Sequence, residues 1–246
     1  MRTERIAKFL ARSGVASRRD AERLIAAGHV AVNGVVATHP ATQVNDNDVL
    51  TINGKPIARR EQSRLWLYHK PAGLVTTARD PQGRPTVFAT LPKSLPRVIS
   101  VGRLDINTEG LLLLTNDGEL ARYLEHPAQS MARCYRVRVH GDPKQSKMIH
   151  LERGATVDGV HYLPLKVKVD NRKGSNCWMT VTLNEGKNRE IRKLLRYAGL
   201  QVARLIRASY GPFELGGLAR GAVEEVPQEF LRRVLSGYFA QQDAPH

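Results

Sequence analysis

One stretch in the middle of the chain, residues 98–118, constrains the fold more than any other. It begins with the β-branched run Val98-Ile99-Ser100-Val101, which predicts a buried strand. Gly102 interrupts this run directly before Arg103-Leu104-Asp105, as glycine commonly does where regular structure ends. The sequence therefore places the carboxylate of Asp105 at the exit of a buried strand.

Three interpretations of Asp105 follow from this position. An Asx turn needs no chemistry, because Asp often accepts a hydrogen bond from its own backbone where a strand ends. Asp105, Asn107 and Glu109 also resemble the first ligands of a calcium loop, but Asn116 stands where the bidentate Glu belongs and the flanks are strand-like. The third interpretation is a catalytic carboxylate with Arg103 close by. Spacing alone excludes the calcium loop and leaves the other two open.

Length and composition set the wider bounds. A chain of 246 residues allows one large domain and one small domain, and 41% hydrophobic residues are ordinary for a soluble protein. No apolar run approaches the roughly 18 residues of a membrane helix, and the N-terminus lacks the apolar core of a secretory signal. We therefore expect no membrane association and a cytoplasmic location. Cys134 and Cys177 form no metal or redox spacing.

Charge is the strongest compositional feature. The chain carries 38 Lys and Arg against 23 Asp and Glu, which gives a net charge of +15. An excess of this size favours a polyanionic partner, and nucleic acid is the usual one. A basic chain can also simply be soluble, so the interpretation depends on whether the charges cluster.

The first cluster lies near the N-terminus. The apolar spacing of Ile6, Phe9 and Leu10 predicts one helix, and Ser17 begins a second helix that Gly28 ends. Between Arg2 and Arg23 there are seven basic and three acidic residues. The pairs Lys8/Arg12 and Arg19/Arg23 stand four residues apart, a spacing at which like charges on a helix repel. An external phosphate would relieve this repulsion.

Two Asn-Gly hairpins follow these helices. Residues 30–36 and 49–57 each place Asn-Gly between apolar runs, which is a strong hairpin pattern. From about Arg5 to Ile57 the chain resembles the small RNA-binding module shared by a small-subunit ribosomal protein, tyrosyl-tRNA synthetases and many RNA-modifying enzymes. The stretches at 14–19 and 28–34 carry the resemblance, which implies that the second helix contacts RNA through Arg18, Arg19 and Arg23. A solvated helix face is the alternative.

The segment 58–64 has no apolar anchor and is predicted to be a linker. After it we expect strands at 65–68 and 74–77 around a turn at Lys70, a surface loop at 80–85 and a short helix at 119–124. Strict alternation predicts a strand over 133–139 with Tyr135 pointing inward. Tyr135 is then either a core residue or part of a cleft. Further strands are predicted around 157, 165–169 and 178–183, with helices over 144–151 and after Pro227.

The second basic cluster spans Asn184 to Arg207, with seven cations against two anions. Ile191, Leu194 and Leu195 follow helical spacing, so a helix buries this apolar stripe and borders it with arginines. Arg192 lies at the edge of the stripe. Its guanidinium can extend to water or pair with a buried carboxylate, and spacing does not decide between them.

Taken together, these segments resemble the bacterial ribosomal RNA pseudouridine synthase family, and within it the large-subunit enzymes that modify a single site. The motifs that carry the resemblance are Lys70-Pro71-Ala72-Gly73, residues 102–118, Tyr135 within residues 133–137, and residues 185–192. The resemblance implies an α+β fold, a mixed and mainly antiparallel sheet with flanking helices. The expected organisation is an RNA-binding module at 3–58, a linker at 59–64, a catalytic domain at 65–240 and a tail at 241–246.

The resemblance also assigns roles by position. Asp105 matches the catalytic aspartate, Tyr135 the tyrosine that stacks on the target base, and Arg192 the basic residue paired with the aspartate. Arg103 matches an arginine that helps to hold the flipped nucleotide, and Lys70 belongs to a motif with a structural role. Arg189 stands where the family often has His, so a substrate-contacting role is expected for it without a defined contact.

The implied reaction breaks the bond from ribose C1′ to N1 of uracil and remakes it to C5, so no cofactor is required. It needs an ionised carboxylate, and a paired arginine favours that form. We expect a monomer that acts on ribosomal RNA or a ribosome assembly intermediate. A noncatalytic RNA-binding assembly factor is the alternative function. A metal-dependent nuclease has little support, because the eight His form no ligand motif.

Overall fold

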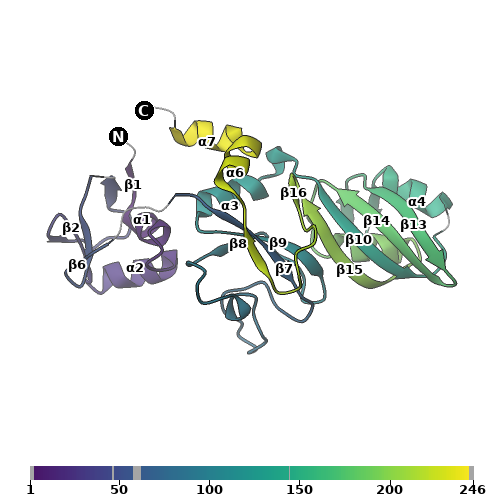
Figure 1. The fold of residues 1–246 in the computed structure, drawn as a ribbon, viewed down its shortest axis with the longest axis horizontal. Helices are drawn as coiled ribbons and strands as arrows, with labels where there is room; N and C mark the ends of the chain where they lie inside the picture. Colours follow the sequence, from purple (N-terminus) through teal and green to yellow (C-terminus); the bar gives the residue numbers. More distant parts are fainter. Residues whose placement is uncertain (1–2, 46, 58–61, 144, 244–246) are drawn as a thin grey trace.

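The computed structural model describes residues 3–45, 47–57, 62–143 and 145–243. A small N-terminal module lies at one end of an elongated molecule, and a long twisted sheet forms the rest (Figure 1). The arrangement is α+β, as expected. No helix within the described ranges is both long and apolar enough to cross a bilayer.

The N-terminal module has the predicted helices and hairpins. Its helices are α1 (Ile6–Arg12) and α2 (Arg18–Ala26), and its four-stranded sheet has the order β3-β2-β5-β6. Those strands are β2 (Val30–Val32), β3 (Val35–Val36), β5 (Leu50–Ile52) and β6 (Lys55–Pro56), while β1 (Thr3–Arg5) pairs separately with β4 (Gln43–Asn45). Ser17 caps α2 by accepting a hydrogen bond from the Asp20 amide, which confirms the predicted start.

Both hairpin turns have the left-handed backbone that their Asn-Gly sequences favour. Asn33 and Gly34 have φ values of 51° and 84°, and Asn53 and Gly54 have 50° and 76°. A positive φ at both central residues is the type I′ geometry that matches the twist of paired strands. The hairpin prediction is therefore confirmed in geometry as well as in position.

A nine-stranded sheet forms the second domain within the described residues. Its main path is β13 (Lys166–Lys173), β14 (Asn176–Leu183), β10 (Arg133–His140), β15 (Gln201–Tyr210), β9 (Glu109–Thr115), β7 (Leu65–Lys70) and β17 (Val223–Glu225). Two further strands, β8 (Ile99–Val101) and β16 (Phe213–Glu214), pair with β9 and β15. Strands β15 and β9 run parallel, and the other described pairings of this sheet are antiparallel. The predicted mixed, mainly antiparallel sheet is confirmed.

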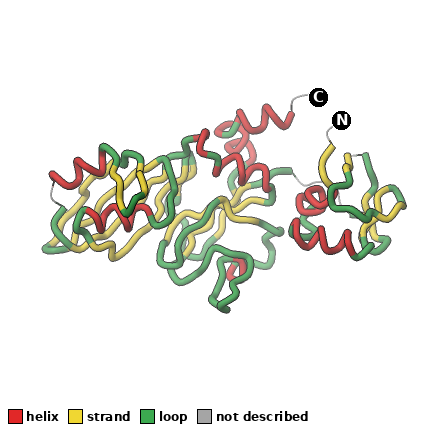
Figure 2. The backbone as a smooth tube through the Cα atoms, turned by 180° about the vertical axis from the view of Figure 1, so that it is seen from behind, coloured by secondary structure: helices red, strands yellow, loops and turns green. Residues whose placement is uncertain are grey.

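Helices cover the two faces of this sheet in different places (Figure 2). On one side α5 (Glu190–Tyr197) and α4 (Gln145–Glu152) contribute to a core with β10, β14 and the two-stranded sheet of β11 (Ala155–Val157) and β12 (Val160–Tyr162). On the other side lie α3 (Gly118–Glu125), α6 (Gln228–Val234) and α7 (Ser236–Asp243). Two short 3-10 turns occupy Phe88–Thr90 and Pro127–Gln129.

Strand β9 lies between the two cores. Leu112 and Leu114 belong to the α5 side, and Leu111 and Leu113 belong to the side of α3, α6 and α7. All four leucines have no measurable exposure. A strand covered on both faces needs a continuous apolar run rather than alternation. This explains the run of leucines that follows Asp105 in the sequence.

Three predicted boundaries differ from the structure. Residues 74–77 form no strand; Val75 makes an isolated bridge to Thr86. The predicted linker falls partly on residues 58–61, outside the described residues, while Ser63 and Arg64 already bond to the second domain at Asp117 and Glu225. The predicted terminal helix is two helices, and α7 continues to Asp243 into the predicted tail, of which 244–246 lie outside the described residues.

Candidate active site

Asp105 lies on a loop that connects β8 to β9, where the sequence predicts a strand exit. The ammonium group of Lys70 donates hydrogen bonds to main-chain oxygens of this loop, at 3.2 Å for Asp105, 3.3 Å for Ile106 and 2.9 Å for Thr108. It also reaches Pro71 O at 3.0 Å. One side chain at the end of β7 thus bonds to three main-chain oxygens of this loop.

Lys70 is completely buried, which the predicted turn at this position does not require. Burial lowers the pKa of its ammonium group to about 8, although the carboxylates of Asp105 and Glu109 act in the opposite direction. Since its partners are backbone carbonyls, its contribution is to fix the loop that carries Asp105. The structural role expected for this motif agrees with these contacts.

Thr76 holds the other end of the loop. Its hydroxyl donates to Leu104 O at 2.8 Å and accepts from Leu104 N at 3.3 Å. The amide of Gly73 donates to Ile106 O at 2.7 Å. Within residues 74–77 the side chain of Thr76 therefore bonds to the loop of Asp105, while the backbone of Val75 bonds to Pro85 and Val87.

A cavity of about 840 Å³ opens beside the loop. The sequence-predicted residues Asp105, Arg103, Tyr135, Arg189 and Arg192 all line it. They come from the β8–β9 loop, from β10 and from the start of α5, so the sheet topology brings together segments more than 80 positions apart. Within the described residues, no group of three His, Cys, Asp or Glu side chains is arranged to hold a metal ion.

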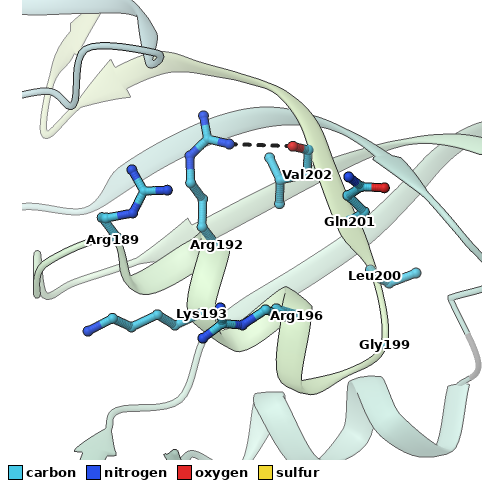
Figure 3. Close-up of a pocket in the computed structure, with 8 residues that line it drawn as sticks. All are labelled: Arg189, Arg192, Lys193, Arg196, Gly199, Leu200, Gln201 and Val202. Carbon is cyan, nitrogen blue, oxygen red and sulfur yellow. Dashed lines mark hydrogen bonds between the residues drawn. The ribbon is translucent and has the colours of Figure 1, made fainter. Parts of the chain in front are cut away.

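The ionic partner of Asp105 is Arg189 and not Arg192, which corrects the expected pairing. Arg189 Nη1 lies 3.6 Å from Asp105 Oδ2. Arg192 instead donates to two main-chain oxygens, Asn107 O at 3.0 Å and Val202 O at 3.4 Å. Figure 3 shows the bond to Val202. The helix begins at Glu190, and Arg189 precedes it in the left-handed conformation with a φ of 52°. Helical spacing alone does not reveal this local turn.

Arg192 nevertheless lies close enough to Asp105 to respond to its charge. Burial lowers the pKa of the Arg192 guanidinium and the neighbouring Arg189 adds to that effect, whereas Asp105 raises it. The two arginines therefore contact the same loop at two points, one at the carboxylate of Asp105 and one at the backbone of Asn107. Asp105 itself keeps 29% of its side chain exposed to the cavity.

Tyr135 combines the two roles that the sequence leaves open. Only 9% of it is exposed, and it belongs to the core that includes Ile191 and Leu194 of α5. It also lines the cavity of Asp105. Tyr135 is therefore fixed by packing and also borders the cavity.

Arg207 is a cavity residue that the sequence does not predict. It is 2% exposed and lies opposite Tyr135 across the β10–β15 pairing. Its Nε donates to Leu111 O at 2.7 Å, and its guanidinium lies 5.1 Å from the ring centre of Tyr210. The alternation along β15 is the sequence pattern from which the burial of Arg207 could be predicted, because Leu205 and Arg207 share the buried face.

Glu190 is a second residue of the cavity that the sequence does not predict. It is 4% exposed, and its Oε2 accepts a hydrogen bond from the amide of Lys187 at 3.0 Å. Burial raises the pKa of Glu190 to about 8, and the neighbouring carboxyl group of Glu185 adds to this effect. Glu185 accepts from Leu163 N at 2.6 Å and pairs with Lys187. This carboxyl pair fixes the turn that leads into Arg189.

Three predicted RNA-binding residues of the N-terminal module, Arg18, Arg19 and Arg23, are exposed on α2. Arg18 lies 3.7 Å from Glu22, and Arg23 lies 2.6 Å from Asp20. Their exposure suits either a solvated face or RNA contact.

Lys8 and Arg12 behave differently from the prediction that a phosphate relieves their repulsion. Arg12 Nη1 lies 3.0 Å from Glu4 Oε2 and 3.4 Å from Glu119 Oε2, and Lys8 also pairs with Glu119. Carboxylates of the protein therefore offset this repulsion. Because Glu119 belongs to α3, the same ion pairs connect the module to the second domain.

Comparisons with known proteins agree with this architecture. The model of the RNA pseudouridylate synthase family matches residues 64–197, and the S4 domain model matches residues 4–50. An uncharacterized RNA pseudouridine synthase of Rickettsia prowazekii is 45% identical over 94% of this chain and 97% of its own length. Ribosomal large subunit pseudouridine synthase B of Salmonella typhimurium is 44% identical over 91% of this chain and 79% of its own. A solved pseudouridylate synthase has the same fold, with a TM-score of 0.67 and 22% identity over 94% of this chain and 99% of that one.

Proposed function

This chain belongs to the RNA pseudouridine synthase family, and on that premise we propose that it isomerises a uridine of large-subunit ribosomal RNA. The family makes it an isomerase and an enzyme rather than a noncatalytic binding factor. The large-subunit target rests on the relatives named for that substrate, which share 44% of their residues with it over most of both chains.

The observation that carries the proposal is the position of the Asp105 carboxylate. It faces a cavity of about 840 Å³, beside Tyr135, and its ionic partner is a cation, Arg189, 3.6 Å away. Pseudouridine formation needs an ionised carboxylate that can act as nucleophile or base at the nucleotide, and a neighbouring cation favours ionisation. In the proposal Asp105 is this group.

The remaining residues of the cavity hold the nucleotide. A base must leave its stack to reach an enclosed carboxylate, which costs a few kcal/mol, and stacking on an aromatic ring recovers part of that cost. Tyr135 is placed for this contact. Arg103, Arg189 and Arg192 supply positive charge along the same cavity for the phosphates on either side of the flipped nucleotide. No step of this isomerisation consumes a cofactor or a metal ion.

The N-terminal S4 domain supplies a second RNA contact. We infer that Arg18, Arg19 and Arg23 on the exposed side of α2 bind RNA phosphates, while Lys8 and Arg12 are occupied by ion pairs with Glu4 and Glu119. The proposal further takes the active form to be a cytoplasmic monomer that acts on ribosomal RNA or on an assembly intermediate.

The test combines a variant with a map of modified sites. Pseudouridines are mapped in ribosomal RNA from cells that lack this protein, and from the same cells supplied with wild type or with Asp105→Asn. We expect one large-subunit pseudouridine to be lost and to return only with wild type. A site that returns with a folded Asp105→Asn protein removes Asp105 from the chemistry. If pseudouridine is lost only from small-subunit RNA, the proposed large-subunit substrate is wrong.

A further inference from the structure

A second cavity lies on the outer side of α5, next to the candidate active site. Its volume is about 550 Å³, and it lies between the helix and the segment that enters β15. Its lining, drawn in Figure 3, consists of Arg189, Arg192, Lys193, Arg196 and residues 199–202. We call it the α5 groove.

The α5 groove carries four cations. Arg192, Lys193 and Arg196 lie on one face of α5 and Arg189 directly precedes the helix, while Ile191, Leu194 and Leu195 of the helix are buried. Among the described residues that line the groove there is no carboxylate. Like charges four residues apart on a helix repel, so this face is more stable with an anion in the groove.

Asp105 lies 3.6 Å from Arg189, but the protein offsets little of the charge at the other end of the groove. The carboxylate nearest to the far end of the groove in the described structure is Asp158, whose Oδ2 lies 3.8 Å from Arg196 Nη2. Both side chains of that pair are more than 70% exposed, 76% for Arg196 and 71% for Asp158. Exposed pairs at such a distance contribute close to nothing measurable. Lys193 and Arg196 are therefore available for an external anion.

The groove is also continuous with the catalytic cavity. Arg189 and Arg192 line both. Arg192 joins them physically, since it donates to Asn107 O on the catalytic loop and to Val202 O on the groove wall. A polyanionic strand with one nucleotide in the catalytic cavity can therefore extend into the groove and meet its four cations.

We propose that the α5 groove binds the phosphates of the RNA strand that flanks the target uridine on one side, with Lys193 and Arg196 as the outer contacts. This inference rests on the proposed function for the identity of the strand. It assigns the groove to the substrate backbone and not to the flipped nucleotide, so Lys193 and Arg196 set affinity while the reacting atoms remain with Asp105.

The experiment measures equilibrium binding, which does not depend on turnover. The probe is a single-stranded 12-mer of uridylate, and its affinity is measured against salt concentration for wild type and for the double variant Lys193→Gln/Arg196→Gln. Each phosphate contact on a single strand contributes about 0.7 to the slope of log K against log salt. Without these two contacts the slope should be flatter by about 1.4, and affinity at 0.1 M salt should fall on the order of tenfold.

The matched control removes two charges elsewhere. Lys166 and Lys168 are exposed on β13, on the face of the sheet opposite Val167 and the core of α5. Lys166→Gln/Lys168→Gln should keep the wild-type slope. A charge-conserving double variant, Lys193→Arg/Arg196→Lys, should also keep it, because phosphate contacts depend on charge.

An unchanged slope in Lys193→Gln/Arg196→Gln overturns the proposal, and so does an equal change in both neutralised variants, since that would reflect net charge alone. Pseudouridine formation in large-subunit ribosomal RNA is measured in parallel. If wild type forms none, the proposed function fails, whereas the binding slopes still decide whether RNA occupies the groove. If wild type is active, the groove variant should raise KM about tenfold with little change in kcat.

Discussion

The ammonium group of Lys70 lies 3.2 Å from the main-chain oxygen of Asp105 and bonds to three other carbonyls around it. Lys70→Met keeps the apolar stem and removes the ammonium donor. Ile106 O and Asp105 O still accept hydrogen bonds from the amides of Gly73 and Thr108, whereas Pro71 O and Thr108 O lose the lysine donor, which costs about 3 kcal/mol of unfolding free energy. A shift of the Asp105 loop should lower kcat on the order of 100-fold. Thermal unfolding and pseudouridine assays check both effects, with exposed Lys93→Met as the control. Normal activity in Lys70→Met would show that the loop keeps its shape unaided.

Arg189 and Arg192 should respond differently to the same substitution. Arg189 meets Asp105 through one nitrogen at 3.6 Å, so Arg189→Lys conserves the charge that matters and should change kcat by less than about threefold. Arg192 uses two nitrogens of its planar guanidinium for Asn107 O and Val202 O. A lysine cannot reproduce that geometry, so Arg192→Lys should lower kcat on the order of tenfold. The reverse order in single-turnover rates would restore Arg192 as the ionic partner of Asp105.

Gly110 should tolerate no side chain. Its φ is +101°, and a Cβ would lie 2.3 Å from Arg207 O and 2.6 Å from Arg207 N, where β9 and β15 pair in parallel. Gly110→Ala should therefore cost about 3 kcal/mol or more, because backbone strain and a clash with main-chain atoms act together. Gly217→Ala is the matched control, since its Cβ would meet nothing within 4 Å. Denaturant unfolding of the two variants measures the difference, and equal midpoints would refute the argument.

The exposed arginines of α2 should contribute to RNA affinity through charge alone. Replacing Arg18, Arg19 and Arg23 by Gln should flatten the salt dependence of binding by about 0.7 to 0.9 for each phosphate that the variant no longer binds. Arg23 already lies 2.6 Å from Asp20, so Arg19, for which the described structure shows no ion pair, should have the largest single effect. Salt titrations of the single variants separate the three. An unchanged slope in the triple variant would identify a solvated face.

Elements with local sequence patterns could be predicted well. The cap at Ser17, the turns at Asn33-Gly34 and Asn53-Gly54 and the alternation around Tyr135 depend on residues close together in the chain, and the structure has all of them. The position of Asp105 at a strand exit is likewise a local inference. Its catalytic assignment requires the family resemblance, because an Asx turn has the same sequence pattern.

The remaining features depend on contacts between distant segments. The parallel pairing of β9 with β15 aligns Gly110 with Arg207, 97 positions later in the sequence, and no local pattern encodes it. Thr76 lies in a segment with strand-like composition, yet its hydroxyl bonds to Leu104 instead. Arg189, and not Arg192, pairs with Asp105 because Arg189 itself has a left-handed backbone directly before α5, a conformation that non-glycine residues seldom adopt.

The buried carboxyl of Glu190 gives the protein a distinct dependence of stability on pH. Its pKa is raised from 4.5 to about 8, chiefly by burial and then by Glu185, so the folded state holds a proton that the unfolded state has released between these two values. The folded state binds more protons across this window, and stability therefore falls as pH rises through it. The slope from this group is at most about 1.4 kcal/mol per pH unit.

Glu190→Gln keeps the hydrogen-bonding shape of the protonated acid and removes its titration. The unfolding free energy of this variant, measured by denaturant titration from pH 5 to pH 9, should decline less than that of wild type, so that the two curves diverge above about pH 5. Glu229→Gln, an exposed substitution on α6, should follow the wild-type curve. Parallel curves for Glu190→Gln and wild type would mean that Glu190 is ionised in the folded state, which would contradict the raised pKa.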